Sequence, residues 1–280
     1  MKKVEVVLKG TEQKPISLDY HLPEKVNGPI VIYAHGFNGF KDWGGMDLIA
    51  EQFAKKGMPF VKFNFSHNGT TPDNLTEFVD VEGFKSNTIA KELNDFYIVV
   101  NWVDKEFSKI VGKKFSKVLI GHSKGGSEAI LFTAKRKGLI NKLITWSAAA
   151  YSDIPWHNWP TDKMFTWQKS GAVEIENQRT KQKMLLGREL FEDYENHKAT
   201  YDVVKAAASI ECPWLICHGT EDETVGVESA DLLKKQCPDA QVLKIKGTGH
   251  TYDRKEPWTE RSLPSAAKKL VLASIRFAGK

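Results

Sequence analysis

The chain has 280 residues, of which 41% are hydrophobic and 27% are charged, and its formal net charge is +5. This composition is ordinary for a globular protein with one large core, and it excludes a disordered chain and a disulfide scaffold. The lysines stand as scattered pairs and form no long run, so we expect solvated helix faces and no nucleic-acid partner.

The N-terminus and the cysteines favour a cytoplasmic protein. Residues 1–5 read MKKVE and open no apolar segment like that of a signal peptide. No stretch reaches the roughly 20 apolar residues that span a bilayer. Cys212, Cys217 and Cys237 form neither a paired disulfide framework nor a metal-ligand spacing. We therefore expect free thiols, no membrane span and no metal; the sequence leaves both a monomer and a homodimer open.

Short β-like runs alternate with helical patterns along the chain. Residues 4–8 and 16–22 predict an opening antiparallel pair, and the apolar run 30–34 predicts a strand buried on both faces. Helical periodicity is found at 46–56, 86–107, 126–134, 227–236 and 264–277, and further strands are predicted at 60–65, 117–120, 142–146, 213–217 and 241–245. This alternation predicts an α/β fold with a mainly parallel twisted sheet of about eight strands, flanked by helices.

Residues 151–208 interrupt this rhythm. The segment shows no convincing strand, and it carries Trp156, Trp159 and Trp167 ahead of charged helical sequence. We predict a helical cap inserted above the carboxyl edge of the sheet, where open α/β sheets bind their ligands. Residues 1–150 and 209–280 would then form the core. The tryptophans are candidate walls of a substrate pocket, and packing of the cap onto the core is the alternative role.

The most specific motif is G-x-S-x-G at residues 121–125. A predicted strand precedes it and a predicted helix follows it, so Ser123 would stand in a tight strand-to-helix turn. Glycines at the flanking positions allow the two elements to approach closely. The helix N-terminus behind the serine favours developing negative charge. These features make Ser123 a candidate nucleophile.

A serine hydroxyl needs a base within hydrogen-bond reach, usually a histidine oriented by a carboxylate. His250 follows the last predicted strand and Asp222 follows the strand before it, so both fall on the same sheet edge as Ser123. Glu221 and Glu223 adjoin Asp222 and are alternative acids. Residues 35–39 also end a strand, and they place the amide of Phe37 near the turn. The amides of Phe37 and Lys124 are the predicted oxyanion hole.

Four motifs together resemble the α/β-hydrolase superfamily over nearly the whole chain: H-G-F at 35–37, G-H-S-K-G-G at 121–126, H-G-T-E-D at 218–222 and G-x-G-H at 247–250. The chain is most similar to small serine esterases and to the serine aminopeptidase and acylglycerol lipase group, with cinnamoyl esterases and dienelactone-hydrolase-like proteins as near neighbours. The resemblance implies Ser123 as nucleophile, His250 as base and then acid, and Asp222 as the orienting carboxylate. A helical cap between the sixth strand and the strand of the acid is typical of these relatives.

Several residues near these motifs have open roles. We expect the three histidines beside turns, His35, His122 and His218, to hold loops through hydrogen bonds. His67 is a candidate pocket residue, or else part of a surface turn. The charged side chain of Lys124 departs from the Gln or Met common in such esterases; it would favour anionic substrates or pair with Glu128.

The predicted function is a cofactor-independent serine hydrolase that cleaves a small carboxylic ester through an acyl-enzyme intermediate. Cleavage of a peptide or other amide, or formation of a peracid, would use the same triad and is an alternative. A ligand-binding member of the fold without turnover is the third reading. The motifs do not separate ester from amide chemistry, because both pass through a tetrahedral oxyanion.

Overall fold

The computed structural model describes residues 1–280 except 113 and 178–180, and its core is one eight-stranded sheet. In spatial order the strands are β1 (Lys2–Lys9), β2 (Pro15–Leu22), β4 (Phe60–Phe63), β3 (Ile30–Ala34), β5 (Lys117–His122), β6 (Lys142–Trp146), β9 (Trp214–Gly219) and β10 (Gln241–Ile245). The opening pair β1–β2 is antiparallel, as is β2–β4, and every other neighbouring pair is parallel. The carboxyl ends of the parallel strands therefore meet at one edge.

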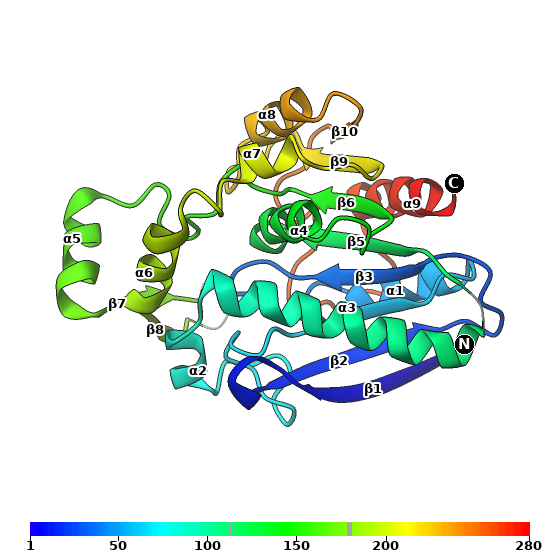
Figure 1. Ribbon diagram of the computed structural model, residues 1–280, viewed down its shortest axis with the longest axis horizontal. Helices are drawn as coiled ribbons and strands as arrows, with labels where there is room; N and C mark the ends of the chain where they lie inside the picture. Colours follow the sequence, from blue (N-terminus) through cyan, green and yellow to red (C-terminus); the bar gives the residue numbers. More distant parts are fainter. Residues whose placement is uncertain (113, 178–180) are drawn as a thin grey trace.

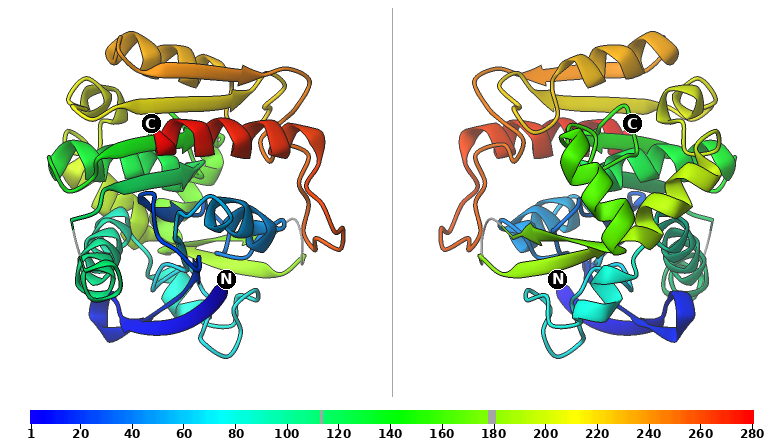
Figure 2. Two further views of the ribbon diagram at one scale, coloured as in Figure 1. Left: turned by 90° about the vertical axis from the view of Figure 1, so that its right-hand side faces the viewer. Right: turned by 90° about the vertical axis from the view of Figure 1, so that its left-hand side faces the viewer.

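Helices cover both faces of this sheet (Figures 1 and 2). One face packs against α1 (Met46–Ala54) and α9 (Ser265–Gly279), and the other packs against α3 (Ile89–Val111), α4 (Lys124–Lys135), α7 (Val203–Ala207) and α8 (Glu228–Gln236). Each face has its own buried apolar cluster, because the central strands are buried on both sides. The predicted mainly parallel sheet of about eight strands between helices is confirmed.

The longest helix shows how the sequence sets its bounds. Its apolar positions Phe96, Val100 and Val103 are buried against the sheet, as the periodicity predicts. The helix begins later than residue 86, because the Thr88 side chain caps it by accepting from the amide of Lys91. It ends at Gly112, whose φ of 65° suits a glycine.

The segment between β6 and β9 differs from the purely helical insertion that the sequence predicts. It contains α5 (Thr161–Ser170) and α6 (Arg188–His197), and also a two-stranded antiparallel sheet of β7 (Ala172–Glu176) and β8 (Lys183–Gly187). The prediction of no strand in this segment is wrong. These strands have five residues each and only one apolar face, so their period-two signal is too short to stand out from the surrounding charged sequence.

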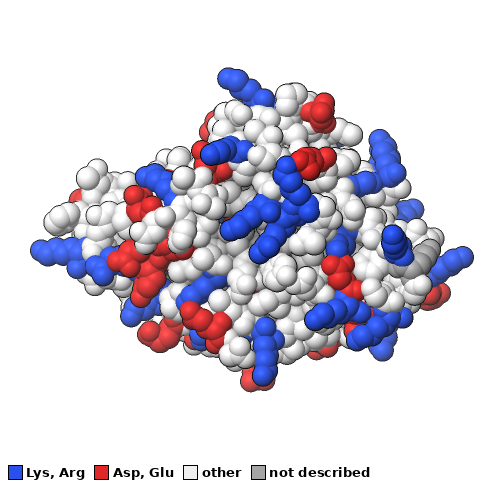
Figure 3. Space-filling model, viewed as in Figure 1, with Lys and Arg blue, Asp and Glu red and all other residues white. Residues whose placement is uncertain are grey.

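This insertion lies beyond the carboxyl ends of the parallel strands, beside the short helix α2 (Val81–Lys85) (Figure 1). Contacts from the core hold it: the amide of Ala90 donates to Asp193 at 3.0 Å, and the side-chain amide of Gln182 donates to the carbonyl of Phe78 at 2.8 Å. Figure 3 shows acidic and basic side chains interspersed over the face viewed there. In the described part of the chain, no helix has the length and apolar character required to cross a membrane.

Candidate active site

Ser123 lies at the sharp turn between β5 and α4. Its backbone has φ 55° and ψ −124°, a region that L-residues rarely adopt, and its amide donates to the carbonyl of Trp146 at 3.0 Å. A Cβ on Gly126 would lie 2.6 Å from that of Ala148, and one on Gly121 or Gly125 would meet backbone atoms even more closely. The glycines of the motif are therefore required by packing, and the strained serine is held between them.

The loop after β3 packs against this serine. A Cβ on Gly36 would lie 2.8 Å from the Cβ of Ser123, so only glycine permits the approach. The next residue, Phe37, lines the same cavity as Ser123. Outside the regular elements no described backbone bond uses the Phe37 amide, and Lys124 is the first residue of α4, where amides have no partner within the helix. Both predicted oxyanion donors are thus unpaired next to Ser123.

Buried ion pairs anchor this loop to strands β2 and β4. Lys41 and Asp42 of the loop pair with Asp19 of β2 and Lys62 of β4. A described group of potential metal ligands lies here, Asp19 with His21 and Asp47, whose ligand atoms are within 4.8 Å of one another. Lysines already neutralise its carboxylates: Lys62 pairs with both aspartates, and Lys3 and Lys41 add to them. The arrangement therefore anchors the loop and leaves little charge for a cation.

His250 and Asp222 form the closest pair of the candidate triad. The Nδ1 of His250 lies 2.8 Å from Oδ2 and 3.1 Å from Oδ1 of Asp222. The carboxylate also accepts from the amides of Thr224 and Val225, at 3.0 and 2.9 Å. Burial alone would raise the pKa of Asp222, but hydrogen bonds from His218 and His250 hold it well below its usual range. Asp222, and neither neighbouring glutamate, is thus the carboxylate that is bonded to His250.

In the described residues, no hydrogen bond joins the Ser123 hydroxyl to His250, although both side chains line one cavity. Such bonds are often long before substrate binds. The Nδ1–H of His250 is directed to Asp222, so in this tautomer Nε2 is the nitrogen that can accept a proton. The geometry therefore leaves the basic nitrogen of His250 for the serine.

Three neighbouring histidines hold loops, as the sequence predicts. His122 donates from Nε2 to the carbonyl of His250 at 3.0 Å, and His218 donates to the carbonyl of Val225 at 2.8 Å. His35 donates from Nδ1 to the carbonyl of Gly36 at 2.8 Å. Burial lowers the pKa of His35 to about 4 and the pKa of His122 well below its usual value. Both rings are therefore neutral near neutral pH and cannot repel a protonated His250.

The cavity beside Ser123 has a volume of about 150 Å³ and is built mainly by loops that follow β3, β5 and β10. It is lined by Tyr33, His35, Gly36, Phe37, Asn38, Gly39, Trp43, His122, Ser123, His250 and Thr251. Its space corresponds to about five water molecules. Of the predicted pocket residues, none of His67, Trp156, Trp159 and Trp167 lines this cavity.

Those four residues have structural contacts instead. His67 is buried, lies 2.8 Å from the hydroxyl of Ser66 and reaches Glu12 at 3.2 Å. Trp156 and Trp159 pack edge-on against Trp167, with ring centroids 5.2 and 5.4 Å apart. Burying the apolar side of the insertion requires these rings, which is the alternative role that the sequence left open. The sequence could not separate the two roles, because both a pocket wall and a packed core use large aromatic side chains.

The Lys124 side chain turns away from this cavity. It is buried between α3 and α4, with ion pairs to Glu128, at 2.5 Å, and to Glu92. The amide of Asn87 donates to the other oxygen of Glu92 at 2.8 Å. Pairing with Glu128 is therefore confirmed, and a direct contact of Lys124 with an anionic substrate is not supported.

Sequence reasoning missed Tyr33, Trp43 and Thr251. Tyr33 is the penultimate residue of a predicted strand, and Thr251 directly follows His250. Both therefore lie near the carboxyl edge of the sheet, and that position could have marked them as residues of the cavity. Trp43 comes from the loop after β3, whose path the sequence does not reveal.

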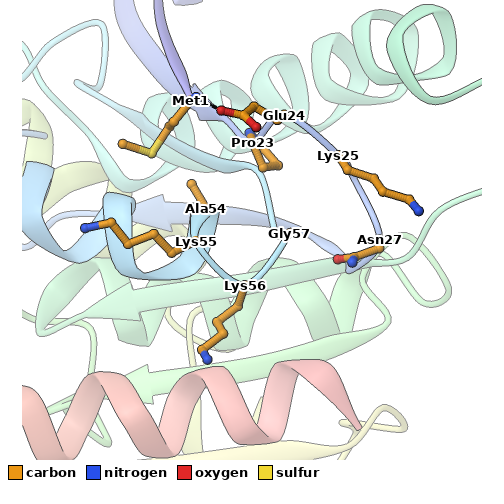
Figure 4. A pocket seen from close by; sticks show the side chains of 9 residues that line it. All are labelled: Met1, Pro23, Glu24, Lys25, Asn27, Ala54, Lys55, Lys56 and Gly57. Atoms are coloured by element: carbon orange, nitrogen blue, oxygen red, sulfur yellow. Dashed lines mark hydrogen bonds and ion pairs between the residues drawn. The ribbon is translucent and has the colours of Figure 1, made fainter.

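A second hollow lies at the opposite edge of the sheet and contains none of the candidate residues (Figure 4). Its volume is about 550 Å³, and it is formed by Met1, by residues 23–27 ahead of β3 and by residues 54–57 after α1. Lys25, Lys55 and Lys56 are exposed and point in different directions, and the N-terminal amine already pairs with Glu24. It offers no convergent polar groups.

Comparison with known proteins adds a family. The family model described as putative esterase matches residues 11–262. A putative esterase/lipase of Haemophilus influenzae is 21% identical over 269 residues, which are 85% of this chain and 82% of that protein. Putative esterase/lipase 2 of Mycoplasma genitalium is 35% identical over 103 residues, and that match spans only 31% of the relative and 36% of this chain.

The fold has a solved counterpart. The mouse α/β hydrolase domain-containing protein 10 superposes with a TM-score of 0.69 at 18% identity, over 97% of this chain and 96% of that one. The predicted α/β-hydrolase fold is thereby confirmed.

Proposed function

Because the chain belongs to the putative esterase family, we propose that it hydrolyses small carboxylic esters with Ser123 as nucleophile. The observation that carries the proposal is the convergence on one small cavity. A strained serine, a histidine bonded to a buried aspartate, and an unpaired loop amide all lie around the same space. Each has the role that acyl transfer needs.

In the acylation step, Nε2 of His250 takes the proton of the Ser123 hydroxyl as its oxygen attacks the ester carbonyl. Asp222 stabilises the imidazolium that forms. The amides of Phe37 and Lys124, with the N-terminus of α4, hold the oxyanion. His250 then gives its proton to the leaving alcohol, and the acyl group remains on Ser123.

Deacylation repeats the sequence with water in place of the serine. His250 takes a proton from the water, the hydroxide adds to the acyl carbonyl, and the same two amides hold the second oxyanion. Collapse returns the proton to the oxygen of Ser123 and releases the carboxylic acid. The volume of about 150 Å³ favours short acyl chains.

The test is turnover of ethyl and nitrophenyl esters from acetate to octanoate by the wild type and by Ser123→Ala. We expect activity that falls with chain length and a loss of at least about 10³-fold in the variant. A fluorophosphonate should label the wild type stoichiometrically and leave Ser123→Ala unlabelled. Ser127→Ala is the matched control, because Ser127 is buried in the same helix and bonds to the carbonyl of Ala149.

Unchanged esterase activity in Ser123→Ala would refute the proposal. Labelling without turnover of any ester would favour a binding protein, and an aminoacyl amide in the panel tests peptidase chemistry by the same triad. Peroxide added to the ester assay tests formation of a peracid.

A further inference from the structure

A buried arginine without an acidic partner lies behind one wall of the cavity. Arg254 is only 3% exposed. Its Nε donates to the carbonyl of Thr251 at 3.1 Å, and its Nη1 contacts the sulfur of Met46 at 3.2 Å. Its Nη2 is buried without a hydrogen-bond partner, and no carboxylate of the described residues forms an ion pair with it. Buried charges are normally paired, so this guanidinium is unusual.

The arginine touches two of the residues that line the cavity, Thr251 and Trp43. It bonds to Thr251, and its guanidinium carbon lies 5.5 Å from the ring centroid of Trp43. Its charge also acts on the hydroxyl of Tyr33, which lines the cavity: burial raises the pKa of that hydroxyl, while the charge of Arg254 acts in the opposite direction. Arg254 therefore lies directly behind one side of the cavity, although it is not itself one of the residues that line the cavity.

Tyr33 can carry the influence of this charge into the cavity. A guanidinium only donates hydrogen bonds, so Arg254 cannot accept the hydrogen of the Tyr33 hydroxyl. The hydrogen of the Tyr33 hydroxyl is then left for another acceptor, and no described hydrogen bond uses it. A phenol polarised by a cation donates most strongly to an anionic oxygen.

In the described residues, none of the ionisable groups around the cavity forms an ion pair with Arg254. His35 and His122 are kept neutral by burial, which lowers the pKa of each. The charge of Lys124 is matched by its two glutamates, and the carboxylate of Asp222 is satisfied by two amides and two histidines.

We propose that the cavity recognises an ester carrying a carboxylate group, which accepts a hydrogen bond from Tyr33 and is attracted by the charge of Arg254. This proposal rests on the proposed function and names its substrate class. Given about 150 Å³, the carboxylate is separated from the scissile carbonyl by a short chain. It can stand on the acyl half or on the alcohol half, and the experiment distinguishes the two.

The test compares two pairs of esters of equal size. Monoethyl succinate is paired with ethyl 4-methylpentanoate, which replaces the acyl carboxylate by an isopropyl group. The second pair is 3-acetoxypropanoate and isoamyl acetate, in which the same replacement is made on the alcohol. Product release is followed by proton NMR at pH 7.5. We expect kcat/KM to favour the anionic member at least tenfold in one pair, which identifies the half that carries the carboxylate.

Variants then assign the preference. In Tyr33→Phe and in Arg254→Gln, the ratio of anionic to neutral kcat/KM should fall at least tenfold. Tyr33→Phe retains the ring and its packing, so it keeps the test decisive if Arg254→Gln does not fold. Ser147→Ala is the control for losing a buried hydrogen bond nearby, because Ser147 donates to the hydroxyl of Tyr252 at 3.0 Å, and its ratio should match the wild type.

Equal losses for the anionic and neutral esters in Tyr33→Phe would show a structural role and overturn the inference. So would the hydrolysis of both neutral esters by the wild type as fast as their anionic partners, which leaves the proposed function intact. No turnover of any of the four esters would overturn the proposed function, and the inference with it.

Discussion

Replacing Lys124 with methionine leaves two buried carboxylates between α3 and α4 without a positively charged partner. Glu92 and Glu128 are 6% and 1% exposed, and Lys124 is their common cation. Removing one partner of a buried ion pair costs about 3–5 kcal/mol of stability. Burial already raises the pKa of Glu128 more than Lys124 lowers it. When Lys124 is removed, we therefore expect one of the two glutamates to take up a proton.

This protonation also determines how much stability the variant loses and how that loss depends on pH. A glutamic acid has a pKa of 4.5 when unperturbed. Keeping one protonated at pH 7 costs about 1.36 × 2.5, or roughly 3.4 kcal/mol, and at pH 5 about 0.7 kcal/mol. The folded variant binds more protons than its unfolded chain in this range, so its stability falls as pH rises. We expect Lys124→Met to lose about 3–4 kcal/mol at pH 7 and about 1 kcal/mol at pH 5.

The assay is urea unfolding of the wild type and the variant at both pH values, followed by tryptophan fluorescence. The matched control is the triple variant Lys124→Met with Glu92→Gln and Glu128→Gln, which keeps the shapes and removes the charges; we expect it to recover most of the loss at pH 7. A stability loss below about 1 kcal/mol at pH 7, or the same loss at pH 5 and pH 7, would refute the role of Lys124 as the partner of the two buried carboxylates.

Three further predictions concern the site. Asp222→Asn should lower kcat by about 10⁴-fold because His250 loses its orienting acceptor, whereas Glu221→Gln should retain wild-type kcat in the same ester assay. Gly36→Ala should lower kcat by about 10²-fold, since its Cβ would lie 2.8 Å from that of Ser123; a variant with full activity and an unshifted crystal structure would contradict this. NMR titration should give His35 a pKa near 4, and because the folded form resists protonation, the wild type should lose about 3 kcal/mol more than His35→Asn between pH 7 and pH 4.

The sequence predicts those parts of the fold that backbone chemistry and periodicity determine. The strands 30–34, 142–146 and 241–245 have the predicted bounds, because each is a short run rich in apolar and β-branched residues or flanked by clear turn residues. The turn at residues 121–125 was recognisable for a related reason. Its glycines are required because a Cβ at their positions would lie less than 3.0 Å from other atoms. Such constraints act over a few residues and therefore remain visible in one sequence.

The walls of the cavity are not predictable in this way. Trp43 and Arg254 are separated by 211 positions, and their contact depends on how two loops that are distant in the sequence pack together. The hairpin of the insertion was missed for a similar reason, since its five-residue strands are stabilised by cross-strand pairs such as Glu174 with Lys183, at 2.9 Å. Tertiary contacts of this kind leave no periodic signal.

The two loops that form the cavity are also joined to each other outside it. The amide of Gly44, in the loop after β3, donates to Glu256 at 2.8 Å, and Gly44 packs against Arg254 at a backbone φ of 65° that favours glycine. The loop that carries Phe37 and the loop that carries His250 are therefore joined by a direct hydrogen bond. A substitution at Glu256 would shift both loops, so its effect on the positions of Phe37 and His250 should be coupled. Ser123, Asp222 and His250 follow β5, β9 and β10, whereas part of the cavity wall is formed by the two loops that this bond joins. Under the proposed function, substitutions at residues 37–45 and 251–257 should therefore alter selectivity without any change in residues 121–125.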